Sequence, residues 1–184
     1  MPLALAAAFL LSACIPASGE PTAAPAASVN TAPVPAASPA ATAPPVAAFP
    51  GAPANWEELP SSPGDWFYAS RPPYSYAAFG KSEQDFAFTI RCERTTGTVS
   101  LGRVSAIATP QPMRILAESA ARAVTAQPRQ GSVERLLAAD LAAHDPLLDA
   151  IAISKGRFAI EVAGTETLYL PSWTEVTRVI EDCR

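Results

Sequence analysis

His144, Asp145 and Ser154 are the residues whose types could form a hydrolytic site. Such a site needs a histidine within hydrogen-bond reach of an activated serine, and a carboxylate that orients the imidazole ring. His144 lies beside Asp145, but the residues around Ser154, Ile-Ser-Lys-Gly, lack the first glycine of a nucleophile elbow. We therefore interpret His144 as a surface residue next to a helix cap. A small hydrolase is kept only as the less favoured alternative to a protein without enzymatic activity.

Acidic side chains cluster at Asp140, Asp145 and Asp149. A loop that binds a hard cation needs several oxygen ligands around a glycine turn, and this stretch contains no glycine. One histidine and three cysteines are too few for most zinc sites, and no Gly-rich phosphate loop or CxxC pair occurs. We therefore expect no metal and no cofactor, and interpret these acids as a helix cap and a solvated face.

Four aromatic residues, Trp66, Tyr68, Tyr74 and Tyr76, lie on either side of a proline pair. Rigid aromatic side chains anchor many protein interfaces, so this group is the candidate partner-binding surface. Packing in the core of a small domain is the competing interpretation, and it is the one that the sequence favours.

An apolar run over residues 3–11 leads into a cysteine. The run has the length of a signal-peptide core and is too short to span a bilayer. Leu11-Ser12-Ala13-Cys14 resembles the lipobox of bacterial lipoproteins. The resemblance implies a signal peptide over residues 1–13 and a lipidated Cys14 whose three acyl chains would hold the protein on a membrane. Because no basic residue precedes the run, we expect the true start codon to lie upstream.

Ile15 follows the cysteine, where an aspartate would imply retention at the inner membrane. The resemblance therefore implies the outer membrane, with the protein facing the periplasm. Ordinary secretion with a chance cysteine is the alternative.

The next 40 residues, 15–54, hold 15 Ala and 10 Pro, and their only charged residue is Glu20. So many prolines remove any helical or strand period, and such a segment cannot bury enough apolar area to fold. We expect residues 14–54 to be the lipidated cysteine with a disordered Ala/Pro-rich tether, about 120 Å long when fully extended. Residues 55–184 then form the folded periplasmic domain. The net charge of −4, without any basic block, argues against binding to nucleic acid.

Alternating apolar residues predict most strands of the folded part. The clearest is 85–92, which forms a hairpin with 98–101, and further strands are predicted at 66–69, 74–79, 158–162 and 168–170. Residues 112–141 fit either a helix or strands, and the turn signal at 128–132 favours strands. The pattern predicts an α+β domain that is mainly antiparallel sheet, with a C-terminal helix packed on it.

Two helices have recognisable starts. Asp145 and Pro146 predict an N-cap and first position of a short helix that runs to about Ile151. Ser172 and Glu175 have the spacing of a capping box. The helix that follows would place five residues on its inner face: Trp173, Val176, Val179, Ile180 and Cys183.

Cys92 and Cys183 are predicted to form a disulfide. Acylation of Cys14 would leave these two cysteines in an oxidising compartment. Cys92 lies on the inward face of its strand, and Cys183 lies on the inward face of the last helix, so the two thiols point into one small core. Two separate buried thiols are the alternative.

The folded part also resembles small uncharacterised envelope domains of alphaproteobacteria, in the segments Asp145–Asp149 and Ser154–Phe158 and in the ending from Leu170 to Arg184. This resemblance implies no activity. The sequence therefore predicts a membrane-anchored envelope lipoprotein with a non-enzymatic binding or structural domain, whose partner is a protein or a cell-wall component. An inhibitor or accessory factor of a secreted protein is the alternative.

Overall fold

The computed structural model of the chain describes residues 51–131 and 134–184. These residues form a nine-stranded antiparallel sheet and two α-helices, which confirms the predicted α+β class. The strand order is β1-β2-β3-β4-β7-β6-β5-β8-β9. The predicted signal peptide, Cys14 and the predicted tether as far as residue 50 lie outside the described residues.

Most elements lie close to their predicted positions. The strands are β1 (Asp65–Arg71), β2 (Tyr74–Gly80), β3 (Phe86–Glu93), β4 (Thr98–Val104), β5 (Gln111–Ala117), β6 (Ala120–Gln130), β7 (Arg135–Ala142), β8 (Arg157–Val162) and β9 (Leu168–Pro171). The helices are α1 (Pro146–Ile153) and α2 (Thr174–Glu181), and a short 3-10 helix, η1 (Trp56–Glu58), precedes β1. None of the described helices is long and apolar enough to cross a membrane.

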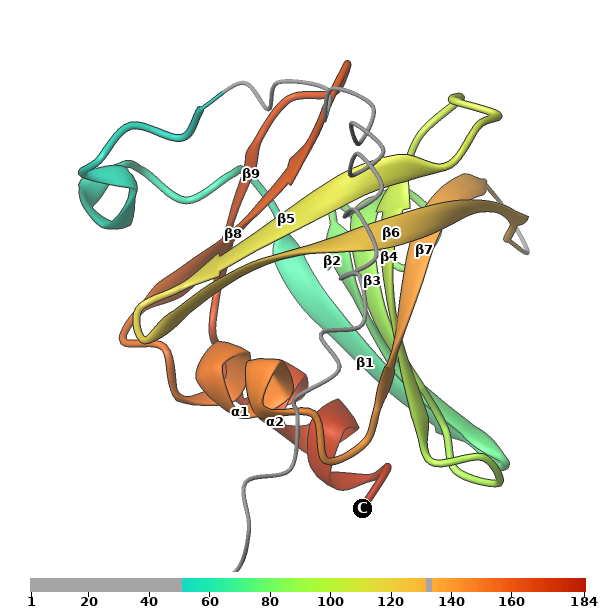
Figure 1. Cartoon of the computed structure of the whole chain (residues 1–184). Helices are drawn as coiled ribbons and strands as arrows, with labels where there is room; N and C mark the ends of the chain where they lie inside the picture. The colour runs from blue at the N-terminus through green and yellow to red at the C-terminus, as the bar shows by residue number, and fades with distance from the viewer. Residues whose placement is uncertain (1–50, 132–133) are drawn as a thin grey trace, which may run out of the picture. The chain divides into compact units, whose positions relative to one another are not determined.

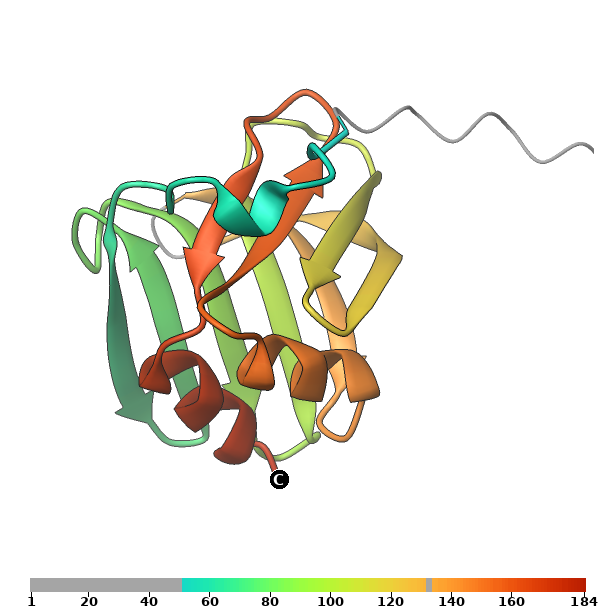
Figure 2. The ribbon, with the colours of Figure 1, turned by 90° about the vertical axis from the view of Figure 1, so that its left-hand side faces the viewer.

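The sheet curls until its two ends approach each other (Figures 1 and 2). The backbone N–H of Ser62, just before β1, donates to the carbonyl of Tyr169 in β9 at 2.8 Å. The N–H of Tyr169 donates in return to the Ser62 hydroxyl at 3.0 Å. Both helices lie together at one end of the curled sheet (Figure 2). The sheet therefore has an inner face that encloses the core and an outer face that is open to solvent.

The inner face is filled by large side chains from opposite parts of the sheet. Trp66 of β1 lies 5.2 Å from Phe79 and 6.4 Å from Phe158, measured between ring centroids. Its indole N–H donates to the Pro171 carbonyl at 2.8 Å. Because Phe158 and Pro171 belong to β8 and β9, these contacts join the two ends of the sheet.

Residues 112–141 are strands, as the sequence favoured, but they form two hairpins. The turn predicted at 128–132 begins too early, because residues 128–130 still belong to β6, which pairs with β7 from Gln127–Ala138 to Gln130–Arg135. The turn at Glu118–Ser119 between β5 and β6 was not predicted. It was missed because Ala120–Ala123 is alanine-rich and has no Gly, Pro or Asn to mark a turn.

The start of α1 confirms the predicted cap. The Asp145 carboxylate accepts the N–H of Leu147 at 2.8 Å, and Pro146 occupies the first helical turn. Asp145 also pairs with Arg122 of β6 at 2.7 Å, so the cap fixes the helix against the sheet as well.

The predicted capping box of α2 is wrong. The Ser172 hydroxyl donates to the carbonyl of Ile151 at 3.0 Å and its N–H donates to the carbonyl of Gly156 at 3.1 Å, and the helix begins only at Thr174. Trp173 takes the N-cap position without a side-chain bond and is 47% exposed, against the prediction that it faces the core. The other four inner-face positions of this helix are buried as predicted: Val176, Val179, Ile180 and Cys183.

The folded part begins before Asn55, where the sequence analysis placed its start. The N–H of Ala52 donates to the carboxylate of Glu161, a residue of β8 with no exposed surface. Arg114 of β5 pairs with the same carboxylate at 3.2 Å. A buried acid on the outer face of this strand is thus neutralised and covered by the segment that enters the domain.

Candidate functional site

The structure divides the predicted aromatic group between the two faces of the sheet. Trp66 is only 6% exposed and lies in the core. The Tyr68 hydroxyl donates to Asp182 at 2.7 Å, and the guanidinium of Arg178 in α2 lies 4.0 Å from the centre of its ring. Tyr74 and Tyr76 line a pocket on the outer face. The four residues therefore do not form one partner-binding surface, and only the last two remain candidates.

Alternation along β2 explains this division. Ser75, Ala77 and Phe79 are buried on the inner face, so Tyr74 and Tyr76 point outward together with Ala78. Neighbouring strands add outward residues that are small, among them Gly102 of β4 and Ala138 of β7, which are directly paired.

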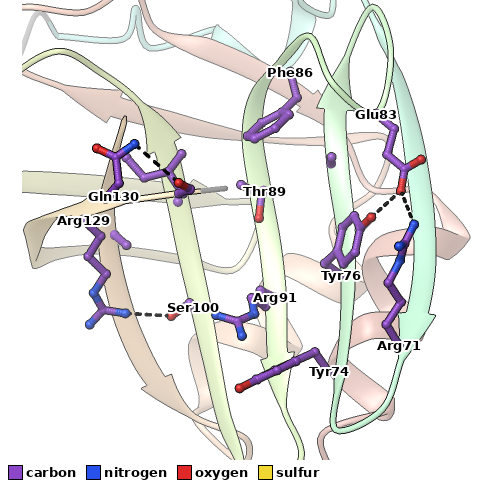
Figure 3. Close-up of a pocket in the computed structure, with 15 residues that line it drawn as sticks. Arg71, Tyr74, Tyr76, Glu83, Phe86, Thr89, Arg91, Ser100, Arg129 and Gln130 are labelled. Atoms are coloured by element: carbon purple, nitrogen blue, oxygen red, sulfur yellow. Dashed lines mark hydrogen bonds and ion pairs between the residues drawn. The ribbon is translucent and has the colours of Figure 1, made fainter. Parts of the chain in front are cut away.

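These residues form the outer groove, a pocket of about 420 Å³ across β2, β3, β4 and β7 (Figure 3). Its floor consists of Ala78, Thr89, Gly102 and Ala138, which pair in one row across the four strands. Phe86 lines it beside the β2–β3 hairpin, and Leu136 lines it beside the β6–β7 hairpin.

The groove is hollow because three of its four floor residues are glycine or alanine. A Cβ atom built on Gly102 would lie 3.4 Å from both Leu136 Cδ1 and Thr89 Cγ2. A methyl group is thus in van der Waals contact there, and any longer side chain must extend into the groove. Gly102 is the residue on which the depth of the pocket depends.

Three arginines line the outer groove, and two of them have acidic partners. Arg71 pairs with Glu83 at 3.5 Å, and Arg129 forms hydrogen bonds of 2.9 and 2.6 Å to the two oxygens of Asp140. The hydrogen bonds from Arg129 hold the pKa of Asp140 below its ordinary value. In each pair, the carboxylate therefore balances the positive charge of the arginine at the rim of the groove.

The third arginine, Arg91, lies with its guanidinium 3.9 Å from the centre of the Tyr74 ring. Within residues 51–131 and 134–184 it forms no ion pair. A more polar hollow of about 300 Å³ adjoins the groove at Arg91, Tyr74, Ser100 and Arg129. Arg91 therefore stands where the apolar groove meets a polar surface.

On the far side of the groove Tyr76 donates to Glu83. Burial, with this hydrogen bond and the negative charge of Glu83, raises the pKa of Tyr76. The phenol therefore stays protonated at neutral pH and holds the Glu83 side chain at the groove wall. In this position the Arg71–Glu83 pair lies beside the opening (Figure 3).

The candidate catalytic residues are engaged in local structure. The Ser154 hydroxyl donates to the Ala150 carbonyl at 2.9 Å and accepts the N–H of Glu118 at 3.1 Å. His144 is exposed beside the cap of α1. The hydrogen bonds of Ser154 within the described part of the chain lead to the backbone and not to this histidine.

The three clustered acids are held apart by separate partners. Asp140 pairs with Arg129, Asp145 with Arg122, and Asp149 with the C-terminal Arg184 at 2.6 Å. In the described ranges, no three His, Cys, Asp or Glu side chains gather as metal ligands.

Cys92 and Cys183 lie at disulfide distance, with their Cα atoms 5.4 Å apart. Cys92 has no exposed surface and Cys183 is 7% exposed. The pair links strand β3 to a residue just beyond the last helix. Strand alternation and helical period predicted that these two thiols would meet.

Sequence reasoning missed the outer groove as a site. Outward-facing charged residues are common on a solvated sheet, so the sequence does not distinguish Arg91 from Arg94, Arg103 and Arg157. The structure separates them, because Arg94 pairs with Asp182 at 3.3 Å and Arg103 donates to the backbone carbonyl of Ala87 at 3.0 Å. The one signal that pointed to the groove was the outward alternation of Tyr74 and Tyr76.

No protein-family model, curated protein or solved structure matches this chain.

Proposed function

We propose that this chain is a lipoprotein of the bacterial envelope, anchored to a membrane through Cys14, whose folded part is a non-enzymatic binding module. The Leu11–Cys14 segment supports the anchor. The outer groove is the single observation that supports a binding module. Facing the periplasm from the outer membrane, such a module would be held at a distance by the Ala/Pro-rich tether.

Two features of the outer groove favour binding over a purely structural role. Its lining residues lie on the face opposite the core, so the fold does not need Phe86 or Tyr76 at these positions for inner packing. A concave and mostly apolar surface with a few polar groups at its margin is also the usual form of a small-molecule site. A structural sheet face would be covered by charged and polar side chains instead.

Filling the groove tests the binding module. The full chain, immobilised and incubated with an envelope extract, is expected to retain components that Gly102→Val fails to retain, because the new side chain occupies the floor. Ala123→Leu is the matched control, since Ala123 is an exposed strand residue of β6 that does not line the groove. Mass spectrometry identifies what is retained. Equal retention by wild type and Gly102→Val would show that the groove does not bind.

Replacing Cys14 with serine tests the anchor. In cells fed an alkyne analogue of palmitate, the wild-type chain is expected to be labelled and Cys14→Ser to lose all label, because serine has no thiol to form the thioether. Ser12→Ala keeps a small residue in the lipobox and should remain labelled. A fully labelled Cys14→Ser chain would contradict the lipoprotein interpretation.

A further inference from the structure

Charge within the outer groove is not balanced. Three arginines line it with one acid, Glu83, which pairs with Arg71. Two further acids, Asp140 and Glu93, line the adjoining hollow, where Asp140 pairs with Arg129 and Glu93 accepts from Thr95. The guanidinium of Arg91 lies against the Tyr74 ring and on the side of the groove that faces Ser100 (Figure 3). Among the arginines that line the groove, Arg91 is thus the one without an ion-pair partner in the described ranges, although its charge acts on Asp140.

The position of Arg91 suits a negatively charged group. Stacking on an aromatic face uses the plane of the guanidinium and leaves its edge N–H groups to donate. Those N–H groups form a rigid fork that matches two oxygens of one carboxylate or sulfonate. Because the ring of Tyr74 holds the fork in place, less side-chain entropy is lost when an anion binds.

The rest of the outer groove suits a flat apolar body. The floor is made of small residues, with Phe86 and Leu136 on either side. The floor residues are Ala78, Thr89, Gly102 and Ala138. A volume of about 420 Å³ falls within the range of pockets that take small organic ligands. An anion without an apolar body would leave this floor uncovered, and a cation would be repelled by the positive charge of Arg91.

We infer that the outer groove binds a small organic anion with a flat apolar body, whose acidic head pairs with Arg91 while its body lies over Gly102 and Ala138. This inference rests on the proposed binding function and specifies its class of ligand. It assigns Arg91 to recognition of the head and the small floor residues to recognition of the body.

Two probes that differ only in charge test this inference. The first is 8-anilinonaphthalene-1-sulfonate, and the second is N-phenyl-1-naphthylamine, which has the same rings without the sulfonate. In fluorescence titrations of the purified full chain without detergent, Arg91→Gln is expected to weaken sulfonate binding about tenfold or more, the usual effect of one hydrogen bond to a charged group. Binding of the neutral probe should change less than about twofold, because its rings do not use the guanidinium.

Arg178→Gln is the matched control. Arg178 also stacks on a tyrosine, with its guanidinium 4.0 Å from the ring centre of Tyr68, but it lies on α2 and does not line the groove. Its replacement should leave both titrations unchanged. Gly102→Val should weaken both probes, because it fills the floor. Thermal unfolding followed by circular dichroism verifies that each variant is folded.

The outcomes separate the inference from the proposed function. If wild type shows no saturable binding of the sulfonate, or if Arg91→Gln binds it as wild type does, the anion inference is overturned. Loss of neutral-probe binding in Gly102→Val would in that case still support the groove as a binding site. If Gly102→Val alters neither titration, the groove binds neither probe and the binding module is overturned with it.

Discussion

Reducing the Cys92–Cys183 bond is expected to lower the free energy of unfolding by about 4–5 kcal/mol. The two cysteines are 91 residues apart in sequence, so the bond closes a loop that spans most of the folded domain. In the chain-entropy model, a loop of this length restricts the unfolded ensemble strongly, and the restriction disappears on reduction. A small domain is stable by only about 5–15 kcal/mol, so the effect is large.

The reduced domain is nevertheless expected to remain folded at neutral pH. The last helix keeps three side chains without exposed surface, Val176, Val179 and Ile180. Arg184, next to the disulfide, donates to the Ala143 carbonyl at 3.0 Å and pairs with Asp149. These contacts persist without the bond, so reduction should shift the unfolding midpoint without exposing the core.

Urea unfolding with and without a reductant measures the effect. A Cys92→Ala/Cys183→Ala double variant provides the control, because reductant should leave its unfolding curve unchanged. Thiol labelling of the denatured, non-reduced chain is the direct check on the bond. Finding both Cys92 and Cys183 labelled, or the same midpoint with and without reductant, would refute the prediction.

Local sequence patterns were sufficient to predict most strands of the sheet. Alternation in 85–92 and 157–162 predicted two strands, and the structure has strands there. The predicted inward face holds for Phe88, Ile90 and Cys92 but not for Phe86, which lines the outer groove because the pairing of β2 with β3 is irregular at that end. Asp145 and Pro146 marked the start of α1 because both residues act on the first turn of their own helix. Such signals depend only on neighbours in sequence, which is why they could be recognised without a structure.

The errors occurred where a distant residue decides the local structure. Ser172 fits a capping box by spacing. Its backbone N–H, which Glu175 would bind in such a box, donates to the Gly156 carbonyl instead, and its hydroxyl donates to the Ile151 carbonyl. With that cap, the helix would start earlier and turn Trp173 inward. In the structure Trp173 precedes the first helical residue and is exposed. A competing acceptor 21 residues away leaves no trace in the four residues of the motif.

The outer groove depends on long-range pairing in the same way. Gly102 lies opposite Ala138 only because β4 pairs with β7, across a chain segment that includes β5 and β6. Each residue alone appears as an ordinary small residue in a strand. The alternation of Tyr74 and Tyr76 indicates which side they face, but it carries no information about the hollow beside them.

Trp66→Ala is expected to destabilise the domain by about 3–5 kcal/mol, the usual cost of truncating a large buried aromatic residue. Trp66 is 6% exposed and packs against rings from three other strands, which are Phe79 of β2, Phe88 of β3 and Phe158 of β8. Removing the indole would leave a cavity where the first and last parts of the sheet meet. The Pro171 carbonyl would also lose its donor.

Trp66→Phe separates the two contributions. The benzene ring of phenylalanine keeps much of the contact with the core, but it has no N–H to donate to the Pro171 carbonyl. The expected loss is about 1–3 kcal/mol, the cost of leaving a buried acceptor without its partner. A loss as large as that of the alanine variant would mean that the hydrogen bond, and not the filled volume, joins the two ends of the sheet.

Trp173→Ala is the control for both variants. Trp173 is 47% exposed, and its loss should change the free energy of unfolding by less than about 1 kcal/mol, as is usual at the surface. Urea unfolding followed by far-ultraviolet circular dichroism compares all three variants without depending on tryptophan fluorescence. Equal destabilisation by Trp66→Ala and Trp173→Ala would contradict the placement of the two indoles. The difference of several kcal/mol is expected because one tryptophan lies in the core and the other lies at the start of the helix.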